Sequence, residues 1–516
     1  MEVFELVIAL LLGGAALAAL ARRLGLPYPA LLALAGAGLA LVPGTPTVLL
    51  DPELALALFV APVLLDAAFD ASPRDLREHW RQVASLALVA VGLTVAAVAV
   101  TAHALVPGMG WAAAVALGAI VAPPDAAAAT AVLRQLRPPH RLLVILEGES
   151  LFNDASALLI YRLAVGAAVS GAVIGAQVLP TLLVVSAGSL VLGLVLARVT
   201  MLVNSRIRDV ATAVIVQFIG TFGVWLLAEQ AHLSGILTMV VYAMAVARHA
   251  PTFIPARIRI PSYAVWEVAV FVLNVLAFIL VGLQLKPILA RFDRPTAIAY
   301  LGTAVAVCAV VILVRVLWVM GEEMTARFRH RDGAECGRCG SPRNAAVVAW
   351  SGMRGIVTLA AALALPTDFP QRDLILFTAF CVVLGTLVLQ GLTLRPLMRR
   401  LGIEQDDEVD REVRLARDQT ARAAVAALDG AGAQSEQGRL VLRKYEARLG
   451  GGPGPADGPP TGQLMRRAIA AERRRLVELR AEGTIGDDAF HKVEEELDWA
   501  ELNAEASSAA AEQQRA

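Results

Sequence analysis

Charged residues are scarce in this chain of 516 residues. Asp, Glu, Lys and Arg together make up 17% of the sequence and aromatic residues 5%, whereas hydrophobic residues reach 57%. Soluble domains average about 25% charged and about 45–50% apolar residues. The shortage of charge, together with a mean hydropathy of +0.64, excludes a soluble enzyme of this length and excludes disorder over most of the chain.

Cysteine is equally rare, and its placement argues against a resident metal. Cys308 and Cys381 lie within apolar runs, while Cys336 and Cys339 form a single CxxC pair in a polar segment. A structural zinc site takes four ligands, and only His330 lies nearby. We expect free thiols at the CxxC pair; a metal shared between two copies of the chain is the alternative.

The distribution of charge divides the chain into two parts. Lysine occurs only three times, so arginine carries nearly all of the positive charge. No basic patch or glycine-rich nucleotide-binding pattern occurs, and no nucleic-acid partner is expected. Residues 401–516 hold 23 of the 45 acidic residues but only 16 of the 45 basic ones. The sequence therefore predicts a mildly basic membrane part over 1–400 and an acidic, soluble part over 401–516.

Long apolar runs fill the first part. A membrane-crossing helix needs about 20 apolar residues, with a range of about 17–25. The chain is thus predicted to be an all-α polytopic membrane protein. Its thirteen candidate spans lie near 3–21, 28–43, 53–71, 83–106, 111–135, 142–170, 178–203, 209–229, 233–249, 264–285, 296–320, 344–366 and 372–398.

Positive charge alternates between the loops that join these spans. Arginines follow every odd-numbered span from the first to the eleventh. The intervening loops contain no Lys or Arg, apart from two that hold Lys286, Arg291, Arg294 and Arg372. Because positive loops stay inside, this pattern puts the N-terminus outside and the C-terminal part in the cytoplasm. The expected location is the inner (plasma) membrane of the cell, in contact with its lipids.

The ionisable residues inside the predicted spans include a cluster of eight: Asp66, Asp125, Glu147, Glu149, Asp154, Arg162, Arg315 and Arg354. Each costs at least about 2.5–3.5 kcal/mol at the bilayer centre on insertion scales, and such residues are functional by default. Because both signs are present, we expect ion pairs and a wet cavity. Two interpretations of Arg162 stay open: it forms a local ion pair, or it has a role in transport.

Two spans carry sequences that break helices. Pro123 and Pro124 interrupt the fifth span, since proline removes helix hydrogen bonds, and Gly352, Arg354 and Gly355 interrupt the twelfth. If spans one to six and eight to thirteen are inverted repeats, these two spans correspond by count, as the broken helices of transporters do. We expect the freed carbonyls and helix ends to meet near the midplane and to coordinate a cation.

A third cluster is EGESLFND, over residues 147–154. On a helix Ser150 and Asp154 share one face, and Glu149 lies one step round. Hydroxyl, carboxylate and amide oxygens suit a hard monovalent cation such as Na⁺. With no thiolate or histidine cluster beside them, a transition metal is not expected.

These motifs resemble a known family. ILEGESLFNDASALLIYR (145–162) and APPDAAAATAVL (122–133) strongly resemble the bacterial sodium/proton exchanger branch of the monovalent cation:proton antiporters. The resemblance covers about 1–400 and implies thirteen spans, two broken helices that cross at the midplane, a homodimer, and a core that moves against a scaffold. Further matches follow in the family's order: VAPVLLDAAF (60–69), LSGIL (233–237), FVLNVLAFILVGLQL (271–285), RVLWV (315–319) and WSGMRGIVTLAAALALP (350–366).

The resemblance also implies the cation site. Asp154 resembles the family's ion-exchanging carboxylate, and Asn153 its partner in an Asn-Asp pair. Ser150 and Asp66 resemble further cation-site groups, and Asp125 matches the acid of the broken fifth span.

Other positions imply supporting roles. Glu149 and Arg315 resemble a buried pair that steadies the core, and Arg354 resembles the arginine of the broken twelfth span. Relatives often have Thr before the acid of the fifth span, where this chain has Pro124. A side-chain oxygen is therefore missing there, and a backbone carbonyl is the possible replacement.

A secondary antiporter, not an enzyme, is the implied function. Na⁺, Li⁺ or K⁺ and a proton would compete for Asp154, and the loaded site would cross by alternating access, with no cofactor. The Asn-Asp pair implies electroneutral one-for-one exchange, although Asp66 and Asp125 leave the stoichiometry open. A cation channel is one alternative. The other is an intramembrane aspartyl protease using Asp125 and Asp154, but no GxGD-like segment supports it.

The acidic part, over 401–516, is predicted to be a small helical module. Helical spacing with mixed charge runs over 404–450, a Gly- and Pro-rich flexible linker over 450–463, and a helical hairpin over 464–506, turned at Gly483 and Gly486. A solvated module is the simpler interpretation, and a regulatory or dimerising role is the alternative.

Overall fold

The computed structural model describes residues 2–45, 51–133, 136, 138–170, 178–291, 293–329, 341–403, 406–428, 435–449 and 463–513. These residues are helical, with connecting turns and no strand. In the membrane part the helices are α1 (Glu2–Leu24), α2 (Tyr28–Ala40), α3 (Pro52–Ala55), α4 (Ala61–Asp70), α5 (Pro73–Ala84), α6 (Val91–Leu105), α7 (Trp111–Val121), α8 (Ala126–Leu133), α9 (His140–Ser170), α10 (Val178–Asn204), α11 (Val210–Gln230), α12 (Gly235–Phe253), α13 (Ala256–Leu283), α14 (Leu285–Leu289), α15 (Arg294–Arg329), α16 (Pro342–Trp350), α17 (Ile356–Leu363) and α18 (Arg372–Leu401). The tail helices are α19 (Glu408–Leu428), α20 (Glu436–Leu449), α21 (Gln463–Ala481) and α22 (Asp487–Gln513).

Nine helices within the described residues are long and apolar enough to cross a membrane. The other four predicted spans have identifiable departures from a plain apolar helix. The span at 28–43 forms the 13-residue α2, and the one at 344–366 is divided into α16 and α17. Acidic residues lower the apolar character of α9, and the last turns of α12 contain the charged or polar residues Arg248 and His249. The chain is a multi-pass helical protein, and the count of thirteen stays a prediction.

Packing divides the membrane part into two groups of helices. The group that we call the flanking bundle contains α1, α2, α4 and α10–α13. The second group, the site bundle, contains α5–α9 and α15–α18. The bundles meet where α9 contacts α4 and α12, and where α18 contacts α2. Both predicted helix breaks lie in the site bundle.

Small residues let the helices approach closely, as is usual in membrane proteins. At Gly282 of α13, a Cβ atom would lie 2.2 Å from the carbonyl oxygen of Ala33 in α2. A larger residue would force these two helices apart. Close backbone packing therefore holds α2 against α13 in the flanking bundle.

The segment before the fourth predicted span differs from the sequence analysis. The charge pattern places Arg74, Arg77 and Arg81 in a loop, but they lie on the amphipathic helix α5. Ser72 caps this helix, its Oγ accepting a hydrogen bond from the Asp75 N–H at 3.3 Å. A π-helical turn over residues 85–90 then joins α5 to α6. Hydropathy alone does not predict α5, because this helix has too few apolar residues to be recognised as a membrane span.

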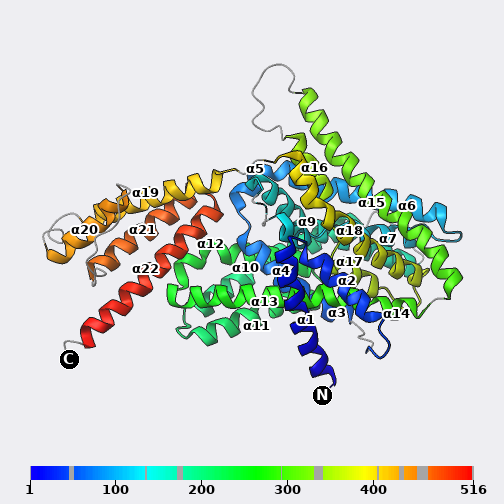
Figure 1. Cartoon of the computed structure of the whole chain (residues 1–516), viewed down its shortest axis with the longest axis horizontal. Coiled ribbons are helices and arrows are strands. Elements are labelled where there is room, and N and C mark those ends of the chain that lie inside the picture. The colour runs from blue at the N-terminus through cyan, green and yellow to red at the C-terminus, as the bar shows by residue number, and fades with distance from the viewer. Residues whose placement is uncertain are drawn as a thin grey trace.

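The four tail helices pack side by side at one end of the molecule, drawn in orange and red at the left of Figure 1. Two apolar clusters hold them together, one around Leu476 and Phe490 and one around Tyr445 and Ile469. The chain turns between α21 and α22 at Gly483, whose φ of +71° favours glycine. We call the surface of the membrane part that contacts α19–α22 the tail face.

Candidate functional site

The two helix breaks meet each other inside the site bundle. The first break separates α7 from α8 and the second separates α16 from α17, at the segments where the sequence predicts them. The backbone N–H of Asp125, in the first break, donates to the carbonyl oxygen of Met353, in the second, at 2.7 Å. Two segments 228 positions apart in the sequence are thereby joined at the centre of the bundle.

Arg354 fills the end of α7. Its fully buried guanidinium donates to the carbonyl oxygens of Val121 and Ala122, both at 3.0 Å, and to that of Gly352. A cation at a helix C-terminus satisfies the free carbonyls and offsets the helix dipole. The carbonyls of Val121 and Ala122, which the sequence analysis expects to coordinate a transported cation, thus accept hydrogen bonds from an arginine of the chain.

Thr386 of α18 supports the second break and was not predicted. Its Oγ1 accepts a hydrogen bond from the backbone N–H of Arg354 at 3.1 Å. The only signal in the sequence is a hydroxyl residue within the apolar run 372–398, and such residues are common in membrane helices.

Asp125 immediately precedes α8 and lies against Gly355. One of its carboxylate oxygens, Oδ1, accepts a hydrogen bond from the Ala127 N–H at 2.9 Å, as a helix cap does. A Cβ atom on Gly355 would lie 1.8 Å from the other oxygen, Oδ2, and 2.9 Å from the Asp125 Cβ. Only glycine leaves room for this carboxylate, so the second break shapes the surroundings of the first.

The Asn-Asp pair of α9 faces the first break. Asn153 is fully buried, and its Nδ2 donates to the carbonyl oxygen of Pro124 at 2.9 Å. Its Oδ1 is buried and has no hydrogen-bond partner among the described residues. Asp154 is 7% exposed and lies within electrostatic range of Asp125. Asn153 therefore offers a buried, unsatisfied amide oxygen next in sequence to a buried carboxylate, and a bound ion would satisfy oxygen ligands of this kind.

Ser150 has a structural contact in this arrangement. Its Oγ accepts a hydrogen bond from the backbone N–H of Ala126, the first residue of α8, at 3.4 Å. The Pro124 carbonyl, considered as the replacement for a missing hydroxyl, accepts the Asn153 amide. The structure thus brings Asp154, Asn153, Ser150 and Asp125 together around one helix end.

Glu149 and Arg315 form a separate buried ion pair. Both side chains are at most 3% exposed, and both guanidinium nitrogens of Arg315 reach the Glu149 carboxylate, Nη2 to Oε2 at 2.8 Å. Arg315 also donates to the carbonyl oxygen of Val348 in α16. The pair therefore ties α9, α15 and α16 together, and its charges satisfy each other rather than a ligand.

Asp66 lies on the wall of a cavity of about 1480 Å³ between the two bundles and the tail. Glu147 of α9 also lines this cavity, whereas Asp154 does not. Seven residues separate Glu147 from Asp154, which is about 10.5 Å along a helix. Acidic side chains outnumber Arg and Lys on the cavity walls, which favours cations in its interior.

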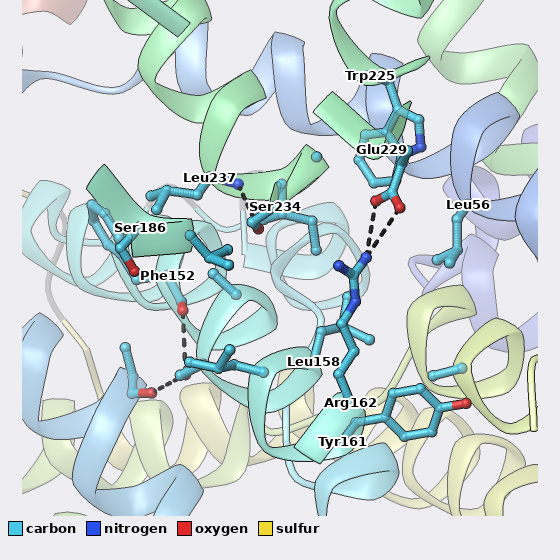
Figure 2. Close-up of a pocket in the computed structure, with 18 of the residues that line it drawn as sticks. Leu56, Phe152, Leu158, Tyr161, Arg162, Ser186, Trp225, Glu229, Ser234 and Leu237 are labelled. Carbon is cyan, nitrogen blue, oxygen red and sulfur yellow. Dashed lines mark hydrogen bonds and ion pairs between the residues drawn. The ribbon is translucent and has the colours of Figure 1, made fainter. Parts of the chain in front are cut away.

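A second cavity of about 1480 Å³ borders another face of α9 (Figure 2). Figure 2 shows Phe152, Leu158 and Tyr161 on its wall, with Arg162 pointing towards Glu229 of α11. The Arg162 Nη2 donates to the two carboxylate oxygens at 3.0 and 3.1 Å. Both side chains are roughly half exposed, so this pair contributes at most about 1 kcal/mol to stability. Arg162 is a locally paired residue that joins the site bundle to the flanking bundle.

Some predicted features lie outside the described residues. These are the CxxC pair at Cys336 and Cys339, and the linker over 450–462. Within the described residues, no group of three or more His, Cys, Asp or Glu is arranged to hold a metal ion.

Comparisons with known proteins find one family. The family model described as sodium/hydrogen exchanger, transmembrane, matches residues 7–400. The chain is 31% identical over 511 residues to the uncharacterized Na(+)/H(+) exchanger Rv2287 of Mycobacterium tuberculosis, covering 94% of this chain and 93% of that protein. It is 33% identical over 366 residues to the sodium, potassium, lithium and rubidium/H(+) antiporter of Bacillus subtilis, covering 67% of this chain and 54% of that protein.

A solved structure shares the fold. The sodium proton antiporter MjNhaP1 from Methanocaldococcus jannaschii is 19% identical to this chain and has a TM-score of 0.58. The match covers 78% of this chain and 99% of that one. At this identity the comparison shows a shared fold: this chain and that antiporter arrange their membrane helices in a similar way.

Proposed function

The chain belongs to the sodium/hydrogen exchanger family, and on that premise we propose that it exchanges Na⁺, Li⁺ or K⁺ for H⁺, with cation and proton competing for Asp154. The family is one of transporters, so the chain is not an enzyme and the protease alternative falls away. The Bacillus subtilis relative is named for four alkali cations, which supports a broad choice of monovalent cation.

The observation that carries this proposal is the environment of Asp154. Its side chain is buried, lies within electrostatic range of Asp125 at the first helix break, and follows Asn153, whose Oδ1 is buried and has no hydrogen-bond partner among the described residues. A desolvated carboxylate needs a positive partner, either a proton or a bound cation. Either partner neutralises the site and neither leaves room for the other, so binding one releases the other. This competition couples the two fluxes.

Alternating access follows from the division into two bundles. Asp154, Asn153 and Asp125 all belong to the site bundle, so a rigid-body shift of this bundle against the flanking bundle carries the whole site. Asp66 and Glu147 line the cavity at the tail face, through which we infer that ions approach the site. We place the tail in the cytoplasm, as the loop charges predict, with thirteen spans in the plasma membrane and a homodimer as the assembly.

Exchange is proposed to be electroneutral, with one cation for one proton. Asn153 adds an oxygen ligand but no charge, so Asp154 is the carboxylate of the pair that titrates. Asp125 already caps α8 through Oδ1, which occupies part of its acceptor capacity. Proton flux measured with and without a potential clamp decides the stoichiometry, because an electrogenic exchanger slows when its own potential is not dissipated.

The test is proton flux in proteoliposomes with an imposed pH gradient. Na⁺, Li⁺ and K⁺ are added in turn, with valinomycin and balanced K⁺ clamping the potential during the Na⁺ and Li⁺ additions. The wild-type chain should dissipate the gradient, and Asp154→Asn should not. The matched control is Asp373→Asn, the same chemical change at a half-exposed residue that pairs with Arg291 at 3.0 Å.

Two outcomes would contradict the proposal. Exchange by folded Asp154→Asn at the wild-type rate would remove Asp154 from the coupling. Na⁺ uptake that continues without any proton movement would identify a cation channel instead. Asp373→Asn should behave as the wild type in both readouts.

A further inference from the structure

The tail helices contact both bundles of the membrane part. On the site bundle, Arg74 of α5 donates to Glu412 of α19 at 3.0 Å, and His140 of α9 lies 3.3 Å from Asp488 of α22. On the flanking bundle, α22 packs along α13. The tail is therefore a bridge between two bodies that are otherwise joined by helix packing and by the Arg162–Glu229 ion pair.

The contact with the flanking bundle is built around a buried arginine. The side chain of Arg259 in α13 is 1% exposed, and its Nε donates to the Asp498 Oδ2 at 2.7 Å. Its Nη1 also lies 3.0 Å from the Glu494 carboxylate. Both acidic side chains are 2% exposed. Removing one partner from such a pair leaves a buried charge uncompensated, which is strongly unfavourable. The tail is thus held in one defined position on α13.

The contact between the tail and the site bundle consists of hydrogen bonds and ion pairs between groups that are less buried than Arg259. The ring nitrogens of His140 lie 3.1 Å from the Asp75 carboxylate and 3.3 Å from that of Asp488. The His140 backbone N–H donates to Asp406, which precedes α19, at 3.0 Å. Within the tail itself, Glu412 accepts a bond from the Gly486 N–H at 2.7 Å, which holds the carboxylate that Arg74 contacts. These bonds involve less buried groups than Arg259, so we expect them to be the part that opens.

One rigid element connects the two contacts. Asp488 and Asp498 are ten residues apart on α22, about 15 Å along a helix. Between them the stacked rings of His491 and Phe69 add a contact to α4, and His491, Lys492 and Glu495 line the cavity that leads to Asp66. Because α22 is fixed at both of these contacts, it sets the separation of the two bundles at the tail face.

From this geometry we propose that α19–α22 form a clamp that holds the site bundle against the flanking bundle and slows ion exchange until it opens. The inference rests on the proposed function, because it assumes that the site bundle moves during transport. The regulated step is the release of the Arg74–Glu412 and His140–Asp488 contacts, with Arg259 keeping the tail attached to the flanking bundle.

The test uses the full-length chain and two independent readouts. Arg74→Glu places a carboxylate against Glu412, so amide hydrogen exchange over 487–498 should rise and the rate of Na⁺/H⁺ exchange should increase about fivefold or more. The double variant Arg74→Glu/Glu412→Arg restores opposite charges and should return both readouts towards the wild type. Arg77→Glu is the matched control, since Arg77 is an exposed residue on the same helix and the same charge reversal there should change neither readout.

The clamp is wrong if Arg74→Glu and His140→Asp both increase amide exchange over 487–498 while ion exchange stays at the wild-type rate. It is equally wrong if neither variant loosens these amides, because the named contacts would then not hold the tail. A failed proposal of function would be recognised separately, as an absence of Asp154-dependent exchange in the wild-type chain.

Discussion

At the scale of single residues, the partner of each buried charge decides what that charge does. Glu149 and Asp154 lie five positions apart on α9 and are both buried. Glu149 is fully engaged by Arg315, whereas Asp154 follows Asn153, whose amide oxygen has no partner among the described residues. The first is therefore a structural charge and the second is available to an ion. The motif places both residues, but the partner from α15 is what separates their roles.

The buried ion pair leads to a prediction about stability. Glu149→Ala should lower the free energy of unfolding by about 3–5 kcal/mol, because it leaves the buried Arg315 unpaired. The measurement is thermal unfolding of the purified protein in detergent, followed by the loss of monodisperse protein on size exclusion.

A double variant serves as the control for this prediction. Glu149→Leu/Arg315→Met removes both charges and should recover much of the lost stability, since an apolar pair of similar volume often replaces a buried ion pair without loss. A Glu149→Ala protein that unfolds at the wild-type temperature would show that the pair does not hold the site bundle together.

At the scale of helices, breaks are easier to predict than their consequences. Proline and glycine inside apolar runs locate both breaks because these residues remove helix hydrogen bonds or widen the accessible backbone angles. The bond between Asp125 and Met353 could not be predicted, since it depends on how two distant helices pack. Arg354 illustrates the same limit: the sequence places it in a break, and only the fold shows that it occupies the end of α7.

The contact between the breaks predicts a strict requirement for glycine at position 355. In Gly355→Ala the new methyl group would collide with the Asp125 side chain, which also caps α8. We expect ion exchange to fall tenfold or more in protein that still purifies as a folded species, as measured in proteoliposomes.

Gly302→Ala is the matched substitution, because a Cβ at that position on α15 meets no other atom within 4 Å. It should leave exchange unchanged. Normal exchange in Gly355→Ala would mean that the close approach of the two breaks is not needed for transport.

At the scale of the whole molecule, composition separates membrane part from tail but does not show how they join. The sequence predicts a solvated helical module and treats Arg259 as a loop charge. In the structure Arg259 is buried under α22, paired with residues 235 and 239 positions further along the chain. Pairing across such distances leaves no periodic pattern in the sequence, so charge counts place Arg259 in a loop and miss its partners.

His140 makes the docking of the tail dependent on pH. Burial alone would lower its pKa, but the carboxylates of Asp488 and Asp75 outweigh burial and raise the pKa to about 10. A group whose pKa is raised on docking stabilises the docked state fully below its undocked pKa and loses that effect as the pH rises through the docked value. When the tail leaves, the Asp488 carboxylate is lost and Asp75 stays beside His140, so the undocked pKa lies below the docked value.

Docking should therefore weaken as the pH rises towards 10. The measurement is amide hydrogen exchange over 487–498 between pH 6.5 and 10, corrected for the intrinsic pH dependence of exchange. Protection should decline with pH in the wild type and should be lower and flatter in His140→Gln. Identical profiles for the two proteins would exclude His140 as the titrating group.

The most direct test of the central claim is proton release on cation binding. NaCl is added to the detergent-solubilised, full-length protein in weak buffer with a pH-sensitive dye, and bound Na⁺ is counted with a radioactive tracer. Competition at Asp154 predicts about one proton released for each Na⁺ bound, no release by Asp154→Asn, and wild-type release by Asp373→Asn. Na⁺ binding without proton release in the wild type, or equal release by Asp154→Asn, would contradict the account.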